Sequence, residues 1–258
     1  MRYFLIAAAA VIPALSAAHA QDGEGTRVRV GLGAQVRPDF VGSDSMEFAP
    51  LFDIDTARGD HEFKFEAPDY SFGIPAIDTG GFEFGPALNL ANGRKNKDVG
   101  GLPLGRVKTT IEAGGYVNYE VSRSFYLHAE LLKGLGGHDG LVGNVGADYV
   151  WRDGDKYVFS IGPRVLFSDS KYQRAYFGVT PAAALATGLP AFRPDGGIHG
   201  VALASGLSYQ FTPDWGMFGY ARYERLVGDA DDSPIVRSKF GSRNQLSGGL
   251  GVTYTFRM

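Results

Sequence analysis

Apolar and polar side chains alternate along almost the whole chain, and no other feature limits the possible folds as much. Near the C-terminus, Leu246, Leu250 and Val252 fall on one face, while small and polar residues fall on the other. A period of two is the period of a β-strand, because successive side chains point to opposite faces of a sheet. No helical pattern accompanies these segments, so something other than a layer of helices must cover their apolar faces.

This alternation predicts twelve strands, and the connections between them alternate in length. Short connections such as Val121–Arg123 are followed by long ones, of which Asp169–Gly197 is the longest. An even number of strands with short turns on one side and long loops on the other is typical of an outer-membrane β-barrel. Ten or fourteen strands stay open, because His61–Ala67 is short and the longest loop could hold a further hairpin. The predicted strands are Arg27–Arg37, Met46–Asp55, His61–Ala67, Tyr70–Ile77, Phe82–Leu90, Arg106–Glu120, Ser124–Lys133, Leu141–Trp151, Lys156–Ser168, Ile198–Phe211, Trp215–Val227 and Asn244–Met258.

The predicted fold is therefore all-β, a closed antiparallel transmembrane β-barrel with short periplasmic turns and long extracellular loops. Lipid would cover the apolar faces. Because no water reaches backbone groups inside a bilayer, every strand must pair and no edge is left free. A soluble β-sandwich is the alternative, but it would bury one face of each strand in a shared core and would not need unequal loops. Leu127, Val145, Ile161 and Leu250 are expected to face lipid, and Gln245 and Ser247 the lumen.

Residues 1–20 have the pattern of a secretory signal peptide. Arg2 is followed by an apolar run from Tyr3 to Leu15 and then by Ala18-His19-Ala20, which match a basic region, a hydrophobic region and a cleavage site. The apolar run is short for a membrane anchor, which needs ~20 residues. We expect cleavage after Ala20, which leaves residues 21–258 as a single domain.

The composition argues against several classes of protein. The chain has no Cys and a net charge of -3, so neither disulfide crosslinks nor nucleic-acid binding is expected. Its mean hydropathy of -0.10 is too polar for a helical membrane protein. The 37 Gly, 13 Tyr and 18 Phe suit strands and turns.

Charged side chains of both signs are predicted on the lumen face. A selective pore would be lined mainly by one sign, since rings of charge set its selectivity. Mixed signs therefore favour a lumen filled by ion pairs. The predicted lumen cations are Arg27, Arg29, Lys64, Lys108, Arg164 and Arg222, and the predicted anions are Glu47, Asp53, Glu66, Glu83, Glu112, Glu130, Asp148 and Glu224.

We predict no catalytic, cofactor-binding or metal-binding residues. An outer-membrane hydrolase would need a nucleophile, a base and a group that orients the base. His128 lies two residues from Glu130 on one face, and nearby strands offer Ser160 and Ser208. No G-x-S-x-G motif supports an enzyme, and a lumen histidine bonded to a carboxylate is far commoner than a catalytic base.

The acidic stretch Gly228–Ser233 raises the question of calcium binding. It lacks the spacing and the glutamate of an EF-hand loop, so a solvated loop is the better interpretation. Asp231 and Asp232 could pair with Arg193 or Lys171 at the barrel rim.

The loop Asp169–Gly197 is expected to fold over or into the barrel mouth. It is far longer than a turn requires, and its prolines oppose continuous strand pairing. We expect Tyr172, Tyr176 and Phe177 to pack there, because a solvated loop gains nothing by holding aromatic side chains.

Several segments of the chain stand out when they are taken together and in order. They are Gly31–Asp44 (GLGAQVRPDFVGSD), Phe84–Arg94 (FGPALNLANGR), Tyr176–Gly197 (YFGVTPAAALATGLPAFRPDGG), Tyr223–Val236 (YERLVGDADDSPIV), Gly241–Gln245 (GSRNQ) and the ending GLGVTYTF. This set resembles the MltA-interacting protein (MipA)/OmpV family of Gram-negative outer-membrane proteins, and the resemblance covers essentially the whole mature chain. One detail departs from the usual pattern of outer-membrane proteins, because Phe256 is followed by Arg257 and Met258 instead of ending the chain.

The resemblance implies a non-enzymatic β-barrel in the outer membrane, in contact with its lipid and lipopolysaccharide. The namesake of the family bridges a lytic transglycosylase and a bifunctional peptidoglycan synthase, so a scaffold linking a murein hydrolase to a synthase is the expected function. Two alternatives stay open: a narrow pore that acts through the lumen, and a surface adhesin that acts through the long loops. No cofactor is expected.

Overall fold

Long antiparallel strands make up most of the computed structural model, which describes residues 25–258. The predicted signal peptide, residues 1–20, lies outside the described residues. Within the described part of the chain, no helix combines the length and the apolar character needed to cross a membrane. The strands are β1 (Thr26–Pro38), β2 (Met46–Arg58), β3 (Phe72–Gly73), β4 (Ile77–Thr79), β5 (Phe82–Ala91), β6 (Thr110–Ser122), β7 (Phe125–Leu135), β8 (Leu141–Asp153), β9 (Tyr157–Ser168), β10 (Gly197–Gln210), β11 (Trp215–Leu226) and β12 (Asn244–Arg257); the helices are η1 (Asn96–Val99), α2 (Ser170–Phe177), α3 (Pro181–Thr187) and α4 (Asp229–Asp232).

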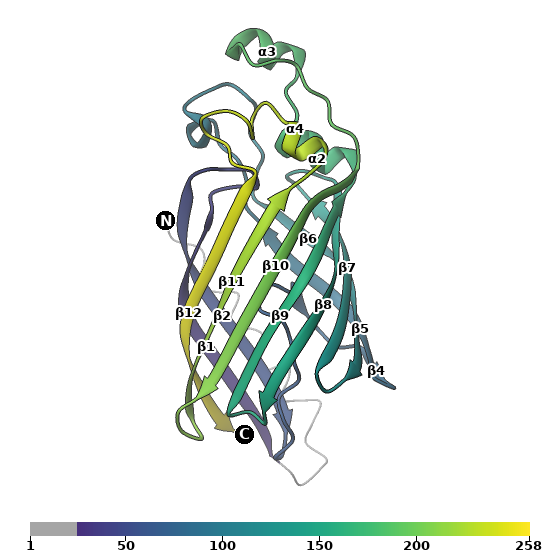
Figure 1. Cartoon of the computed structure of the whole chain (residues 1–258), viewed down its shortest axis with the longest axis vertical. Coiled ribbons are helices and arrows are strands. Elements are labelled where there is room, and N and C mark those ends of the chain that lie inside the picture. The colour runs from purple at the N-terminus through teal and green to yellow at the C-terminus, as the bar shows by residue number, and fades with distance from the viewer. Residues whose placement is uncertain (1–24) are drawn as a thin grey trace.

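All the strands of residues 25–258 belong to one sheet that curls around a central space (Figure 1). The path runs β2-β1-β12-β11-β10-β9-β8-β7-β6-β5-β3, and β4 pairs with β5. Neighbouring strands are antiparallel, and β1 joins the two ends of the chain, because Val30 pairs with Ile54 on β2 and with Tyr254 on β12. The predicted all-β architecture of antiparallel strands is confirmed.

The two faces of the sheet differ in polarity as the alternation predicts. Large apolar side chains are exposed on the outer face; Leu250 on β12 is 63% exposed. On the same strand, Gln245 is buried on the inner face. Leu127 and Val145 are also exposed, whereas Ile161 is half-buried. The predicted register is therefore correct, since a slip of one residue would exchange the two faces.

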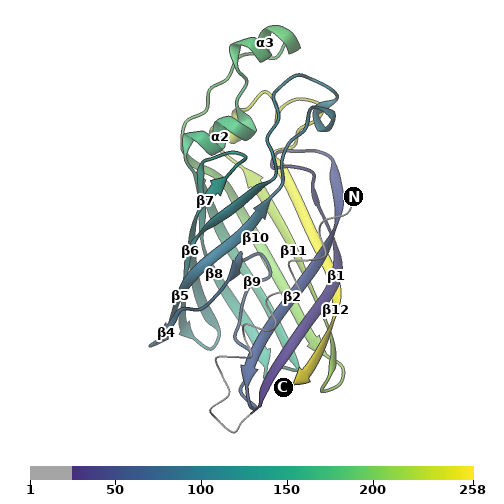
Figure 2. The same ribbon diagram turned by 180° about the vertical axis from the view of Figure 1, so that it is seen from behind.

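The sheet does not close completely in the way the sequence predicted. Strand pairing in residues 25–258 reaches from β2 round to β3 and β4, and no pairing joins β2 to β3, β4 or β5. We call this unpaired boundary the seam (Figure 2). Near its upper end side chains span it, because Glu47 Oε1 accepts hydrogen bonds from Arg37 Nε at 3.0 Å and from Asn92 Nδ2 at 2.7 Å.

The seam exists because one predicted strand leaves the wall of the sheet. His61–Ala67 was expected to be a strand, but residues 59–71 hold no strand and instead run inside the curl of the sheet (Figure 2). The predicted strand Tyr70–Ile77 is likewise reduced to the short pieces β3 and β4. Pro68 lies in the segment that leaves the wall, and Pro75 lies between β3 and β4; proline cannot donate a hydrogen bond to a ladder. We call residues 59–71 the inward segment.

The long loops gather at one end of the sheet and form a folded cap, while the C-terminus lies at the opposite end (Figure 1). We call these the loop end and the turn end, and define the cap as residues 39–45, 92–109, 169–196 and 227–243. Tyr172, Tyr176 and Phe177 are all buried in it, which confirms that Asp169–Gly197 folds over the mouth. They pack with residues of other loops, among them Val107 and Val236.

The register predicts that a charge on the outer face of β12 is costly and that a charge on its inner face is not. We expect Leu250→Arg to lower the free energy of unfolding in lipid vesicles by ~2–4 kcal/mol, because the guanidinium must enter hydrocarbon. Ser247→Arg, three positions earlier, should cost less than half as much, because Ser247 lines a polar interior space. Urea titration in vesicles measures both, and equal losses would contradict the register.

Candidate functional site

Within residues 25–258, the inward segment has no neighbouring strand to pair with. Side chains of the sheet and of its turns bind the segment instead. The Phe63 ring is buried, and the guanidinium carbon of Arg29 lies 4.4 Å from its centroid. The Phe63 N–H donates to Asp155 Oδ1 at 2.9 Å, and its carbonyl accepts from Arg152 Nη2 at 3.1 Å. These contacts satisfy backbone groups that would otherwise be unpaired.

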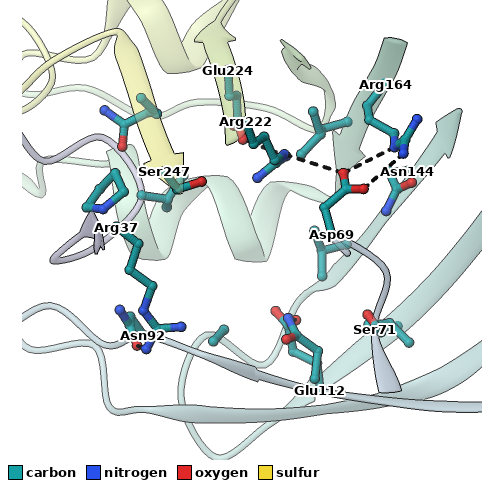
Figure 3. A pocket seen from close by; sticks show the side chains of 18 of the residues that line it. Arg37, Asp69, Ser71, Asn92, Glu112, Asn144, Arg164, Arg222, Glu224 and Ser247 are labelled. Atoms are coloured by element: carbon teal, nitrogen blue, oxygen red, sulfur yellow. Dashed lines mark hydrogen bonds and ion pairs between the residues drawn. The ribbon is translucent and has the colours of Figure 1, made fainter. Parts of the chain in front are cut away.

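Asp69, near the end of the inward segment, is bound by arginines from two different strands. Arg164 on β9 donates from Nε and Nη2 to the two Asp69 oxygens at 3.1 and 2.9 Å. Arg164 Nη2 also donates to Asp148 Oδ1 at 2.9 Å, and Arg222 Nε on β11 lies 3.6 Å from Asp69 Oδ2 (Figure 3). The side chains of Arg164 and Asp148 are almost fully buried. Removing one partner of such a pair costs ~3–5 kcal/mol, so these contacts anchor the segment.

The neighbouring residue, Tyr70, adds a second set of contacts. Its ring stacks on His128 with 3.7 Å between centroids, and its hydroxyl donates to Asp148 Oδ2 at 2.8 Å. His128 Nδ1 lies 2.6 Å from Asn118 Oδ1. Asp69 and Tyr70 thus contact side chains of four strands, β7, β8, β9 and β11. We name this group the Asp69 cluster, which comprises Asp69, Tyr70, His128, Asp148, Arg164 and Arg222.

Most of the charges predicted for the lumen form ion pairs, as the mixed signs suggested. Arg29 Nη2 lies 2.6 Å from Asp55 Oδ2, and Arg27 Nη2 lies 2.9 Å from Asp155 Oδ2. Lys64, on the inward segment, pairs with Glu83 on β5 at 2.8 Å. Lys108 was expected on this face too, but it precedes β6 and is exposed.

Arg94 connects separate segments of the cap. Its side chain is buried and donates to the carbonyl oxygens of Tyr176 and Leu104, the latter at 3.2 Å. The Phe40 ring lies 5.9 Å from the guanidinium carbon. Burial lowers the pKa of Arg94 to about 10, so the group is still a cation at neutral pH.

A chamber of about 330 Å³ lies between the Asp69 cluster and the cap. Asp69, Tyr70 and Arg164 of the Asp69 cluster line it, together with Tyr172 and Tyr176 of α2 in the cap. Figure 3 shows polar side chains from many strands turned toward this space. The inward segment thus runs inside the sheet, and the cap lies over its loop end.

Of the residues weighed as a hydrolytic site, His128 and Glu130 lie close together, with His128 Nε2 3.8 Å from Glu130 Oε2. Neither serine joins them in the described residues: Ser208 Oγ lies 3.5 Å from Arg29 Nη1, and His128 bonds Asn118 and stacks on Tyr70. A different serine and histidine do meet, because Ser168 Oγ lies 3.0 Å from His199 Nδ1. Both are buried beneath α2, with the Tyr172 ring 5.3 Å from the imidazole.

The acidic stretch Gly228–Ser233 contains the short helix α4, and its expected partners were wrong. Asp232 pairs with Arg237, and Asp231 pairs with Arg243 at 3.0 Å. These partners lie in the same loop, so the pairs stabilise the loop itself. Arg193 and Lys171 are exposed.

Sequence reasoning missed Asp69 and Tyr70, which it assigned to a short connection and to a strand. The signal that could have found them is the tripeptide Pro68-Asp69-Tyr70. The predicted connection Pro68–Asp69 is short where the alternation of loop lengths calls for a long one. An acid beside a proline is also a poor start for a lipid-facing strand.

The model of one protein family, described as MltA-interacting protein MipA, matches residues 30–256. The chain belongs to this family. MipA-family relatives include the MltA-interacting proteins of Escherichia coli (strain K12) and Shigella flexneri, each 28% identical over 151 residues. The alignment spans 58% of this chain and 58% of the length of each of these relatives.

Two solved structures in which the chain follows a similar course are less similar in sequence to this MipA-family member. An outer membrane channel from Pseudomonas putida F1 is 9% identical with a TM-score of 0.44, covering 90% of this chain and 96% of that one. The KdgM porin is 10% identical with a TM-score of 0.37, covering 90% and 98%.

The contacts of the Asp69 cluster predict that one carboxylate anchors the inward segment of this MipA-family protein. We expect Asp69→Ala to lower the free energy of unfolding by ~3–5 kcal/mol, since Arg164 and Arg222 lose a shared anion. Asp60→Ala, at the start of the same segment, should cost only ~0–1 kcal/mol, because its pair with Arg257 is exposed. Denaturant titration gives both values, and similar losses would contradict the anchoring role.

The contacts of Arg94 predict that the cap opens separately from the sheet. Arg94→Ala leaves the Tyr176 and Leu104 carbonyls without their donor, and a buried unpaired group costs ~1–3 kcal/mol. We expect faster proteolysis within residues 178–196 of the cap while the strands stay protected. Cleavage rates followed by mass spectrometry test this, and Arg193→Ala on the exposed cap surface is the matched control. An unchanged rate for Arg94→Ala would contradict it.

Proposed function

We propose that this chain is a non-enzymatic outer-membrane β-barrel protein that works as a scaffold through its turn end. The obstructed interior carries this proposal. A barrel that conducts solutes needs a continuous passage, whereas here the inward segment runs through the interior and the cap covers the loop end. A barrel obstructed in this way acts through its surfaces and not as a channel.

The distribution of polarity supports a position in the outer membrane. Apolar side chains cover the outer face and polar ones fill the inside, the arrangement expected of a barrel in lipid. The loop end would then face outward, toward lipopolysaccharide, and the turn end the periplasm. In a bilayer we expect the seam between β2 and β5 to close, because each unpaired backbone group facing hydrocarbon costs several kcal/mol.

The proposed partner is a murein transglycosylase, with a peptidoglycan synthase as the second partner of a scaffold. The name of the curated relatives, MltA-interacting protein, supports an interaction of this kind. The turn end offers exposed charges for docking: Arg123 is 79% exposed and pairs with Glu62 at 3.1 Å. Charges at the rim of an interface mainly set the rate and specificity of association.

A test of the scaffold proposal starts from single-channel conductance in planar bilayers. We expect the intact protein to show no steady open level, and deletion of residues 178–195 to change little, because the inward segment still crosses the interior. Asp69→Ala combined with Tyr70→Ala should produce frequent openings, because the anchors of the segment are gone. A steady open level in the intact protein would replace the scaffold proposal with a pore.

The turn end can be tested directly with a purified lytic transglycosylase. We expect Arg123→Glu to slow association, measured by biolayer interferometry, by roughly tenfold at low salt, because charge steers encounter. Arg193→Glu, an exposed charge reversal in the cap, is the control and should leave the rate unchanged. If both variants or neither slow association, the turn end is not the docking surface.

A further inference from the structure

The cap loop of residues 92–109, which joins β5 to β6 at the loop end, carries an excess of positive charge (Figure 2). It contains five cations and a single anion, Asp98. Asp98 is turned into the loop, because its side chain is only 12% exposed and accepts from the Lys95 backbone N–H at 2.8 Å. The loop therefore presents positive charge to its surroundings that its own acid does not balance. The cations are Arg94, Lys95, Lys97, Arg106 and Lys108.

The backbone of this loop brings three of the cations together on an exposed surface. Arg94 and Val107 pair as an antiparallel bridge, with N–H to carbonyl hydrogen bonds of 3.0 and 2.9 Å in the two directions, and both side chains are buried. Successive side chains of an extended chain point to opposite faces, so the residues next to the bridge are directed outward. Lys95, Arg106 and Lys108 are those residues, and all three are exposed. We call these three residues the basic patch.

No acid of the described residues forms an ion pair with the basic patch. Like charges on adjacent strands repel each other and cost stability, so the fold keeps an unbalanced repulsion at this place. Other charges of the cap are balanced locally: Asp231 pairs with Arg243 at 3.0 Å, and Lys97 lies 3.9 Å from Asp98. An anion from outside the chain would remove the repulsion within the basic patch.

The wall next to the basic patch is apolar. Ile111, near the start of β6, pairs with Leu135 at the end of β7, and both side chains are exposed on the outer face. Lys133, on the same face of β7, extends its ammonium group to the Asp139 carbonyl in the loop that follows, as lysines do at the edge of a hydrocarbon layer. Lys108 lies three residues before Ile111, within ~10 Å of it at ~3.3 Å per residue. In the proposed membrane position, the basic patch is thus at the height of lipid headgroups.

We propose that the basic patch binds phosphate groups of lipopolysaccharide, with the acyl chains of the lipid along Ile111 and Leu135. This rests on the proposed position in the outer membrane, with the loop end facing outward. The Arg106 guanidinium can hold a phosphate through two parallel N–H donors, and the two lysines add point charges. A free phosphate ion would gain little here, because single exposed ion pairs are weak, whereas a lipid also gains the apolar contact.

Binding of purified lipopolysaccharide to the full chain in detergent, measured by microscale thermophoresis, tests the proposal. The second probe is the same lipopolysaccharide after chemical removal of its phosphate groups. The third probe is phosphatidylglycerol, an anionic phospholipid with a single phosphate. We expect the phosphorylated lipopolysaccharide to bind roughly tenfold or more tightly than either of the other probes, because several phosphates meet several cations.

Variants locate the binding. Lys95→Gln, Arg106→Gln and Lys108→Gln should each raise the dissociation constant for lipopolysaccharide by roughly fivefold, and the three together by roughly 100-fold. Lipopolysaccharide without phosphate should not distinguish the triple variant from the unchanged chain. Arg193→Gln, which removes an exposed cation elsewhere in the cap, is the matched control and should have no effect. Without lipid, the triple variant should unfold at an equal or higher temperature, because repulsion is removed; if it does not fold, the single variants decide.

Three outcomes overturn the proposal. The first is that the variants of the basic patch bind lipopolysaccharide as tightly as the unchanged chain. The second is that removal of the phosphate groups does not weaken binding. The third is that phosphatidylglycerol binds as tightly and depends on the same residues. The scaffold role is decided separately at the turn end: Arg123→Glu should leave lipopolysaccharide binding unchanged, so either proposal can fail while the other holds.

Discussion

The ion pair between Asp69 and Arg164 holds the rest of the arrangement in place. It fixes the end of the inward segment to β9, and Arg222 ties the same carboxylate to β11. Tyr70 then reaches Asp148 and stacks on His128. Because Arg164 and Asp148 are buried, neither charge can turn to bulk water, and the inward segment keeps one position across the interior.

The inward position of this segment changes the wall of the sheet. A segment that could have been a strand fills the interior instead, and the wall is left with a seam between β2 and β5. Many of the polar side chains that face inward pair with the segment or with one another, as Lys64 and Glu83 show. The interior is consequently divided, with ion pairs and the inward segment toward the turn end and a polar chamber under the cap.

The sequence predicts the parts of this structure that depend on local alternation. The faces of β12 follow directly from Leu250 and Gln245, because one period of two decides both. Burial of Tyr176 and Phe177 in the cap was also predictable, since a long loop rich in aromatic side chains has to cover them.

The inward segment was not predictable, because Phe63 and Lys64 alternate as they would in a wall strand. What distinguishes the segment is the pairing of Asp69 with an arginine 95 residues away, and no local pattern reveals such a contact. The chamber under the cap was not predictable for the same reason.

The central claim is that the inward segment crosses the interior and is shielded there. The chain has no Cys, so a single introduced cysteine reports on one site. Labelling of Ala67→Cys and Asp60→Cys by a membrane-impermeant maleimide, in vesicles with both faces accessible, measures this shielding. Ala67 is 4% exposed and the Asp60 side chain 86% exposed, so we predict that Cys at position 67 reacts at least a hundred times more slowly, as a rough expectation for a buried thiol. Equal labelling rates at the two positions would contradict the account.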